Sequence, residues 1–290
     1  MSKIVQTLPA SDEKAASRQR VRRYLGWLFA LLAIQTLTYC PATGGGDAIP
    51  MESDLTLISH AGAGLKAATY SNSREALEVA AARGLRLIEV DFETTRDGRV
   101  VAAHDWGQTY VELRPGILPA PLARYFRWGK PDHATFLATP MKGGLTPIDA
   151  IGLARWLDGH PDVKIVTDIK SNNVGTLARL IAHGLPREQL VPQIYSRDEL
   201  AAVRRMGFNE IIYTLYRDTD VPIPDVIDFA RKHRLAVTIH SARVSRADVE
   251  AFRDAGVPLY VHTINEPDRA LRLQEWGAAG VYTDFLRPAS

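Results

Sequence analysis

Short apolar segments alternate with amphipathic helical patterns from Asp54 to the end of the chain, and no other feature constrains the fold as strongly. The segments that read as strands are residues 55–59, 87–92, 163–169, 190–195, 210–215, 236–240, 259–263 and 280–283. Many of the patterns between them begin after Ser, Thr or Asn and end at Gly, which is typical of helix caps. This repeated alternation over about 235 residues predicts an α/β fold, a (β/α)8 barrel of the TIM type.

The main structural alternative is a doubly wound open sheet. Such a sheet normally carries a glycine-rich phosphate-binding turn after its first strand. The corresponding stretch here, "SHAGAGLKAATYS", contains no G-x-G-x-x-G pattern, so we favour the barrel. The chain ends directly after the eighth strand, which predicts an incomplete last helix. Residues 105–144 form a long connection that is either a lid over the site or a surface excursion.

The N-terminal region has a different composition. Four arginines within residues 18–23 precede "YLGWLFALLAIQTLTYC", an uncharged run of about 17 residues, which is near the lower limit for crossing a bilayer. No polar face interrupts this run, which argues against a buried amphipathic helix. The pattern predicts a transmembrane segment at residues 24–40. The basic residues 1–23 are then cytoplasmic, and the rest of the chain is extracytoplasmic, that is periplasmic or extracellular.

This segment reads either as a permanent anchor or as a cleaved signal. It is not followed by a convincing A-x-A-like cleavage site, which favours an uncleaved, single-pass membrane anchor. The stretch "LTYC" loosely resembles a lipoprotein processing box, but Tyr39 stands where such boxes have a small residue, which argues against lipidation of Cys40. Residues 41–53 then read as a flexible linker, and residues 54–290 as the folded barrel domain.

The charge balance excludes some classes of partner. The 35 basic residues nearly balance the 33 acidic ones, so no overall field points to nucleic acid or another polyanion. The single cysteine rules out an intramolecular disulfide and a cysteine-rich metal site. Selectivity for a ligand therefore has to come from local groups.

Two carboxylates stand one residue apart on the second apolar segment, "LIEVDF", at Glu89 and Asp91. Strand side chains alternate between faces, so both point the same way, and in a barrel that direction can be the interior. Adjacent buried carboxylates repel each other and persist only when protons or a cation neutralise them, and a divalent ion such as Mg²⁺ or Ca²⁺ suits oxygen ligands. Asp168 and Lys170 repeat the spacing on the next strand, which adds a third carboxylate.

A tight turn connects the acidic strand to a histidine. If the Asp-Gly pair at 97–98 is the centre of a two-residue hairpin loop, Asp91 lies opposite His104. Directly opposed residues have Cβ atoms roughly 5 Å apart, so His104 is expected beside the carboxylates. His60 ends the first strand, on the rim of the same barrel. The sequence thus predicts two histidines that flank a three-carboxylate cation site.

A set of short motifs, in this order, resembles the glycerophosphodiester phosphodiesterase family. The family pattern is a strand-end H-R-G, a P-E-N-T stretch before a helix, E-x-D and then H-D, and the chain has "SHAG", "YSNS", "EVD" and "HD". Further along, "TDIK" resembles the family's E-x-K, and "VHTINEPDRALRLQEWGAAGVYTDF" resembles its closing T-x-N and T-D strands. The resemblance covers about residues 57–285, and its specificity lies in the ordered set, since each single match is weak.

The resemblance implies a role for each matched position. A divalent cation, Mg²⁺ or Ca²⁺, is expected on Glu89, Asp91 and Asp168, and His60 and His104 are expected to form the acid–base pair. The residues expected to bind substrate or phosphate are Lys170, Asn72, His262 and Asn265.

Three departures from the family pattern leave alternatives open. Ala61 replaces the family's phosphate-binding arginine, residues 70–73 replace P-E-N-T, and Asp168 replaces a glutamate. The D-x-K form also resembles sphingomyelinase D-type phospholipases. Loss of the arginine also suits a catalytically weak barrel that binds polyol phosphates or glycans as a scaffold.

The favoured function is a metal-dependent phosphodiester hydrolase of the phosphoric diester hydrolase class. Its expected substrate is a glycerophosphodiester or a phospholipid or envelope headgroup, with attack by water or by a hydroxyl of the substrate itself. The expected partners are that small or lipid-derived substrate and the membrane, with no nucleic acid.

Overall fold

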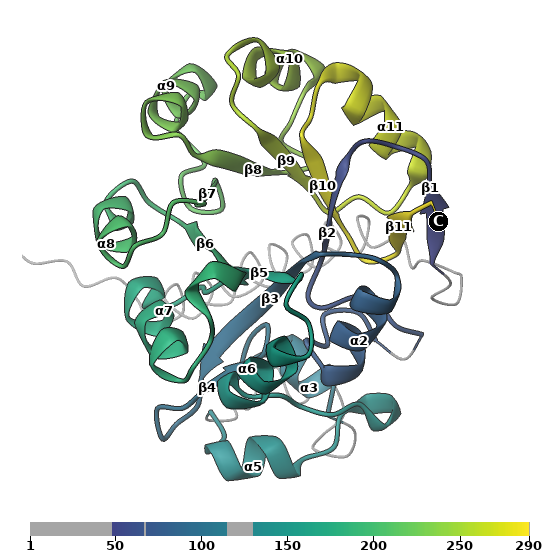
Figure 1. Ribbon diagram of the computed structural model, residues 1–290, viewed down its shortest axis with the longest axis vertical. Helices are drawn as coiled ribbons and strands as arrows, with labels where there is room; N and C mark the ends of the chain where they lie inside the picture. The colour runs from purple at the N-terminus through teal and green to yellow at the C-terminus, as the bar shows by residue number, and fades with distance from the viewer. Residues whose placement is uncertain (1–47, 67, 115–129, 290) are drawn as a thin grey trace, which may run out of the picture. The chain divides into compact units, whose positions relative to one another are not determined.

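Eight parallel strands close into a barrel in the computed structural model, which describes residues 48–66, 68–114 and 130–289 (Figure 1). The barrel strands are β2 (Thr56–Ser59), β3 (Leu87–Thr94), β5 (Lys164–Asp168), β6 (Leu190–Ile194), β7 (Ile212–Thr214), β8 (Ala236–His240), β9 (Leu259–His262) and β10 (Gly280–Thr283). Strand β2 pairs with both β10 and β3, and this pairing closes the barrel. The predicted TIM-type barrel is confirmed.

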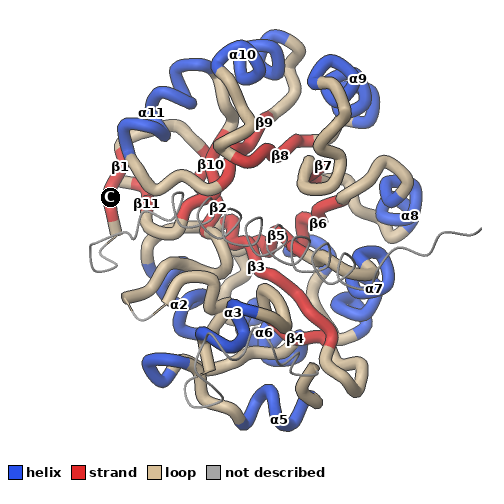
Figure 2. The backbone as a smooth tube through the Cα atoms, turned by 180° about the vertical axis from the view of Figure 1, so that it is seen from behind, coloured by secondary structure: helices blue, strands red, loops and turns tan. Residues whose placement is uncertain are grey.

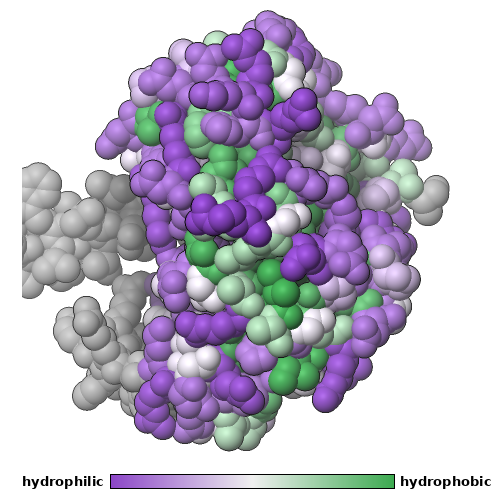
Figure 3. Space-filling view, turned by 60° about the vertical axis from the view of Figure 1, so that its left-hand side comes forward, coloured by the Kyte–Doolittle hydropathy of each residue, from purple (hydrophilic) through white to green (hydrophobic). Residues whose placement is uncertain are grey.

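Helices surround the strands on the outside of the barrel (Figures 1 and 2). Those that connect consecutive barrel strands are α2 (Arg74–Ala82), α6 (Ala150–Asp158), α7 (Asn173–Ala182), α8 (Glu199–Arg205), α9 (Ile223–His233), α10 (Arg246–Asp254) and α11 (Pro267–Trp276). Hydrophilic residues cover most of the face shown in Figure 3, with apolar residues between them. Each helix thus buries an apolar stripe against the strands and leaves its polar side outside.

Strand β3 shows how the sequence divides the core into two layers. Ile88, Val90 and Phe92 belong to the large apolar cluster that also contains the buried residues of the helices. Glu89 and Asp91, which alternate with them, point to the opposite face, into the barrel. A smaller apolar cluster fills part of the barrel interior with Ile58, Val166, Val191, Ile212 and Tyr282. The barrel is therefore packed with side chains, and its polar residues gather at one end.

The hairpin after β3 differs by one residue from the predicted register. Strand β4 (Val100–Ala102) pairs antiparallel with β3, and the loop between them has Gly98 at a φ of 81°. This is a three-residue loop in which glycine takes the left-handed position, and it shifts the pairing relative to a two-residue loop. The amide of Ala103 donates to the carbonyl of Asp91 at 3.0 Å, so the prediction that Asp91 lies opposite His104 is wrong.

The chain termini of the barrel domain also correct the sequence analysis. Ile49–Met51 form β1, which pairs in parallel with β11 (Leu286–Pro288). The predicted linker at 41–53 therefore ends earlier, because its last part is an ordered strand, while its first seven residues lie outside the described residues. The expected incomplete last helix is absent from the described residues, since the chain after β10 pairs with β1 instead.

The connection at residues 105–144 contains α3 (Gln108–Glu112), α5 (His133–Ala138) and a 3-10 turn (Lys142–Gly144). The Arg114 guanidinium packs over the rings of Tyr110 and Phe136, at 5.2 and 4.8 Å from their centroids. These contacts tie both ends of the connection together beside the barrel. Residues 115–129 lie outside the described residues.

Within the described part of the chain, no helix combines the length and apolar character that a bilayer crossing needs. The predicted transmembrane segment at 24–40, Cys40 and the basic region 1–23 lie outside the described residues. Their assignment stays a prediction.

Candidate active site

A cavity of about 360 Å³ opens at the carboxyl ends of the barrel strands. Barrel enzymes place their active sites at this end. The residues that line it are His60, Tyr70, Glu89, Asp91, His104, Thr109, Asp168, Gln193, Thr214, Tyr216, Thr238, His240, Ser241, His262, Thr263 and Tyr282. Acidic groups come from β3 and β5, and histidine, hydroxyl, amide and aromatic groups come from the other strands and loops.

Three carboxylates meet at one wall of this cavity. One oxygen from each of Glu89, Asp91 and Asp168 lies within 4.8 Å of the other two. The register explains the convergence, because Asp91 on β3 is the partner of Asp168 on β5, and Glu89 precedes Asp91 on the same face. The structure thus brings together the three carboxylates that the sequence analysis groups.

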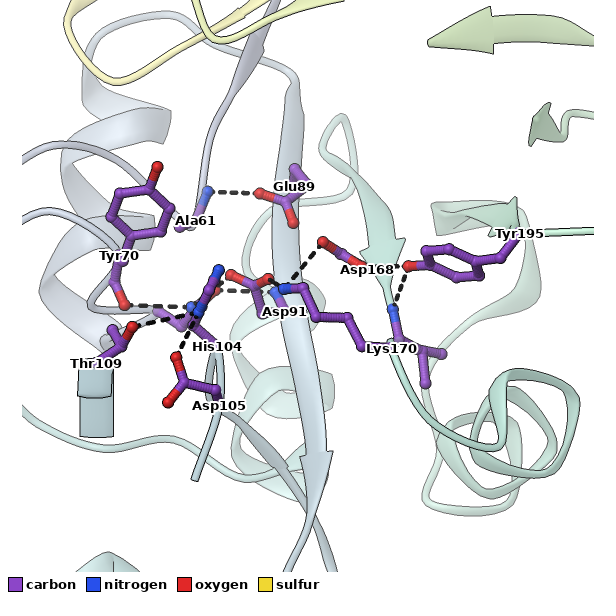
Figure 4. A network of polar contacts seen from close by, with 12 residues as sticks. Ala61, Tyr70, Glu89, Asp91, His104, Asp105, Thr109, Asp168, Lys170 and Tyr195 are labelled. Carbon is purple, nitrogen blue, oxygen red and sulfur yellow. Dashed lines mark hydrogen bonds and ion pairs between the residues drawn. The ribbon is translucent and has the colours of Figure 1, made fainter. Parts of the chain in front are cut away.

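Glu89 is buried and receives one hydrogen bond from the backbone. The amide of Ala61 donates to its Oε2 at 2.6 Å, and Ala61 adopts a φ of 48° at the end of the first strand (Figure 4). Burial and the neighbouring charge of Asp91 raise the pKa of Glu89 well above its usual value. The carboxylate is therefore crowded by negative charge that its own contacts do not neutralise.

Asp91 is held from two sides. Its Oδ1 accepts from Lys170 Nζ at 2.7 Å, and its Oδ2 accepts from the Asn72 side chain at 2.9 Å. Asn72 also accepts from the Asp91 amide at 3.0 Å, so it fixes both the backbone and the carboxylate. Burial opposes ionisation, but the charges of Lys170 and His104 and the hydrogen bonds from Lys170 and Asn72 together outweigh it and lower the pKa of Asp91 to about 2.

Asp168 completes the cluster. Its Oδ1 accepts a hydrogen bond from the Tyr195 hydroxyl, and its Oδ2 lies 3.2 Å from Lys170 Nζ (Figure 4). Burial and Asp91 raise the pKa of Asp168. The ammonium of Lys170 therefore bridges two of the three carboxylates, and it is the positive charge closest to them among the described contacts.

The donor set fits a hard divalent cation. Such ions bind carboxylate oxygens at about 2.0 to 2.6 Å, so ligand oxygens within 4.8 Å of one another can share one ion. Burial and the charge of Asp91 raise the pKa of both Glu89 and Asp168, although Lys170 lies beside two of the three carboxylates. An added cation would relieve this crowding, and the ion would be held by Glu89, Asp91 and Asp168.

His60 lies on the adjacent rim and is fixed by a carboxylate. Its Nδ1 donates to Asp284 Oδ1 at 2.9 Å, while Asp284 Oδ2 accepts from the Asn265 side chain at 2.8 Å. Asn265 also accepts from the Asp284 amide at 2.8 Å. Burial alone would lower the pKa of His60, but the hydrogen bond and charge of Asp284, together with the charges of Glu89 and Asp91, outweigh it and raise the pKa to about 9. Its other ring nitrogen, Nε2, has no hydrogen-bond partner among the described residues, and His60 lines the cavity.

His104, like His60, is held through Nδ1 by a carboxylate. Its Nδ1 lies 2.8 Å from Asp105 Oδ2 and 3.3 Å from the Thr109 hydroxyl, which leaves Nε2 free. The Tyr70 ring stands between the two histidines, with its centroid 4.7 Å from that of His60 and 5.0 Å from that of His104. Both imidazoles are therefore held edge to face against one aromatic ring.

The predicted substrate-binding residues divide into two groups. His262 lines the cavity, stacked with Tyr216 at 5.6 Å between ring centroids. Asn72 and Asn265 do not line it, because each holds a carboxylate from behind, Asp91 and Asp284 respectively. Lys170 reaches the acidic cluster with its side chain 30% exposed.

Sequence reasoning assigned no role to Asp105, Asp284 or Tyr195, which all contact the site. Asp284 directly follows the last barrel strand, and its place in the "TD" motif, quoted only for the resemblance, was the available signal. Tyr195 follows β6, and nothing in its local sequence distinguishes it from a core tyrosine.

Comparisons with known proteins agree with this geometry. The model of the glycerophosphoryl diester phosphodiesterase family matches residues 60–113, which include both histidines, Glu89 and Asp91. A glycerophosphodiester phosphodiesterase from Parabacteroides distasonis is similar in structure, with a TM-score of 0.61 and 13% identity over 80% of this chain and 94% of that chain. A phosphodiesterase from Oleispira antarctica, solved with its product sn-glycerol-3-phosphate, has a TM-score of 0.61 and 17% identity over 79% and 93%. No curated protein gives a significant match.

The family model confirms the resemblance that the sequence motifs predict, and the solved structures confirm the fold. The predicted enzyme class, a phosphoric diester hydrolase like that family, is confirmed on the same ground.

Proposed function

We propose that this chain is a cation-dependent phosphodiesterase that hydrolyses glycerophosphodiesters or phospholipid or envelope headgroups. The observation that carries the proposal is the placement of three carboxylates, two of them buried, within 4.8 Å of one another in a cavity that two carboxylate-bound histidines also line. Binding alone does not require a paired acid and base, so the arrangement favours catalysis over a scaffold role.

The cation, when bound, would coordinate a phosphoryl oxygen and neutralise charge that develops in the transition state. Lys170 would add a second positive charge beside the same phosphate, since its ammonium already bridges Asp91 and Asp168. Asn72 and Asn265 would act behind the site by holding Asp91 and Asp284. The side chain of His262 would contact the substrate at the opposite wall.

The two histidines would divide the proton transfers. His60 is suited to be the general acid, because its pKa of about 9 keeps it protonated near neutral pH, and its free Nε2 can protonate the leaving oxygen. His104 would accept the proton of the attacking hydroxyl at Nε2, with Asp105 orienting the ring through Nδ1. The attacking group is water or a neighbouring hydroxyl of the substrate.

The substrate class is inferred from the family resemblance and from the product-bound relative. The Oleispira phosphodiesterase holds sn-glycerol-3-phosphate, which is half of a glycerophosphodiester. Ala61 is fully buried and offers no charge to a phosphate, so phosphate binding would rest on the cation and on Lys170. A sphingomyelinase D-like headgroup specificity is the alternative, and the D-x-K spacing of Asp168 and Lys170 supports it.

Dependence on a divalent cation tests the proposal. We expect purified protein to hydrolyse glycerophosphodiesters with Mg²⁺ or Ca²⁺ and to lose activity when a chelator removes the ion, because the three carboxylates need it. Product release is measured for glycerophosphodiesters and for sphingomyelin in parallel. Hydrolysis that survives exhaustive chelation would contradict the cation, and a lack of hydrolysis with every cation and substrate would favour a scaffold.

We further propose that the barrel is held on the extracytoplasmic side of a membrane by residues 24–40. The support is the basic flank before this apolar run and the lack of Lys or Arg in "PATGGGDAIPMESD" after it. A reporter that is active only outside the cytoplasm, fused after Ser290, is expected to be active. The same reporter on a chain that begins at residue 41 is the control, which should be inactive. A second fusion carries a reporter that works only in the cytoplasm, and activity of this second reporter would overturn the topology.

A further inference from the structure

Tyr195 contacts the acidic cluster from a neighbouring strand. It directly follows β6, its side chain is buried, and its hydroxyl lies against Asp168 at the end of β5 (Figure 4). We propose that Tyr195 is a positioning residue that holds the Asp168 carboxylate in the orientation a divalent cation requires. This inference rests on the proposed function, because it concerns the cation site of that function.

The hydrogen bonds of the hydroxyl fix its direction. The amide of Ile169 donates to the Tyr195 oxygen at 2.7 Å, so the hydroxyl's own proton is free to point at Asp168 Oδ1. One carboxylate oxygen is thereby held, and the other, Oδ2, faces Lys170, which also contacts Asp91. Asp168 thus presents Oδ2 on the side of Asp91, where the three carboxylates converge.

The tyrosine ring is itself held in place. The Arg217 guanidinium lies over the ring, 5.1 Å from its centroid, and also donates to the carbonyl of Lys170. Arg217 belongs to the loop after β7, so this loop covers a face of the ring. A buried side chain whose ring is covered in this way keeps its hydroxyl at a fixed position, and a hydrogen bond from it orients the ligand that it contacts.

The hydrogen bond from Tyr195 matters because the side chain at position 168 is short. Aspartate is one methylene shorter than the glutamate that the family motif has at this position, so it reaches less far toward a cation. Tyr195 from the next strand fixes the shorter carboxylate, and Tyr195 and Asp168 therefore act as one unit. The unit would replace the longer acidic residue.

The test is the cation affinity of Tyr195→Phe, which removes the hydroxyl and keeps the ring. Titration calorimetry with Mg²⁺ and with Ca²⁺ on the full chain is expected to show a dissociation constant raised by about 10-fold or more, as for other residues that orient metal ligands. Hydrolysis should fall at limiting cation and recover at saturating cation. Tyr213→Phe is the matched control, because Tyr213 is also buried but donates to Asp218, outside the cluster.

A second variant tests the idea that length matters. In the Tyr195→Phe background, Asp168→Glu is expected to recover most of the lost affinity, because the longer side chain reaches the cation without the hydroxyl. A folded Tyr195→Phe protein with wild-type affinity would overturn the inference alone, as would a double variant that binds no better than Tyr195→Phe. A wild-type protein that binds neither cation would overturn the proposed function as well.

Discussion

Glu89→Gln is expected to abolish cation binding and hydrolysis together. Glutamine keeps an oxygen that can accept from the Ala61 amide but loses the charge that a divalent ion requires. We expect turnover to fall by about 10³-fold or more, since a cation contributes several kcal/mol to stabilising the transition state of a phosphoryl group. Calorimetry measures the binding, and product release from a glycerophosphodiester measures the turnover.

The stability of this variant separates a functional role from a structural one. Burial and Asp91 raise the pKa of Glu89 in the folded protein, so the folded state disfavours its charged form. When the pKa of a carboxyl is higher in the folded than in the unfolded state, the folded protein loses stability as the pH rises from the unfolded-state pKa to the folded-state pKa. In chelator at neutral pH, Glu89→Gln should therefore unfold at the same temperature as the wild type or higher. Added cation should raise the melting temperature of the wild type only.

Glu93→Gln is the matched control for this prediction. Glu93 lies on the same strand and is largely buried, but it contacts Lys130 at 3.7 Å outside the acidic cluster. Its replacement should leave cation affinity and turnover near the wild-type values. If Glu89→Gln still bound the cation, or if it destabilised the cation-free protein, the assignment of Glu89 as a ligand would be contradicted.

The alternation of side chains along β3 made much of the site predictable. Period two places Glu89 and Asp91 on one face, and the same spacing at Asp168 requires only that β5 lies beside β3. These are properties of local sequence and of the parallel barrel. The hairpin register was not predictable in the same way, because an Asp-Gly pair also fits a three-residue loop whose glycine takes a positive φ.

Two of the residues that sequence reasoning missed take their role from contacts that are distant in sequence. Asp284 reaches His60 only because β10 pairs with β2, across 224 positions of the chain. Tyr195 reaches Asp168 because β6 lies beside β5. Asn72 and Asn265 were read as substrate contacts, but the structure turns their side chains toward carboxylates. Residue type and motif position therefore identify polar groups, and tertiary pairing decides what they bind.

Replacing either histidine of the site is expected to lower turnover by about 10²-fold or more, the usual contribution of a general acid or base. His60→Ala and His104→Ala are compared with His183→Ala, a histidine that follows α7 outside the cavity. The fold should persist, since both site histidines lie at the mouth of the barrel. Near wild-type rates on a glycerophosphodiester would contradict the role of the histidine concerned.

The leaving group distinguishes the acid from the base. A nitrophenolate leaves without protonation, so His60→Ala should recover much of its rate on a nitrophenyl phosphodiester if His60 is the general acid. His104→Ala should remain slow on both substrates, because the attacking hydroxyl still has to lose its proton. The reverse pattern would exchange the two roles.

The pH dependence gives the same assignment a second measurement. A general acid with a pKa of about 9 sets the alkaline limit of kcat/KM, and Asp284 is the group that raises this pKa against the effect of burial. Asp284→Asn should therefore move the alkaline limit down by about one pH unit or more, because burial then lowers the pKa of His60 against only the weaker effects of the Glu89 and Asp91 charges. The stability that the raised pKa contributes is fully present below pH 6.5 and is lost as the pH rises through about 9, so the variant should also lose less stability over this range than the wild type. An alkaline limit that stays where the wild type has it, in a variant that remains folded, would mean that another group supplies the proton.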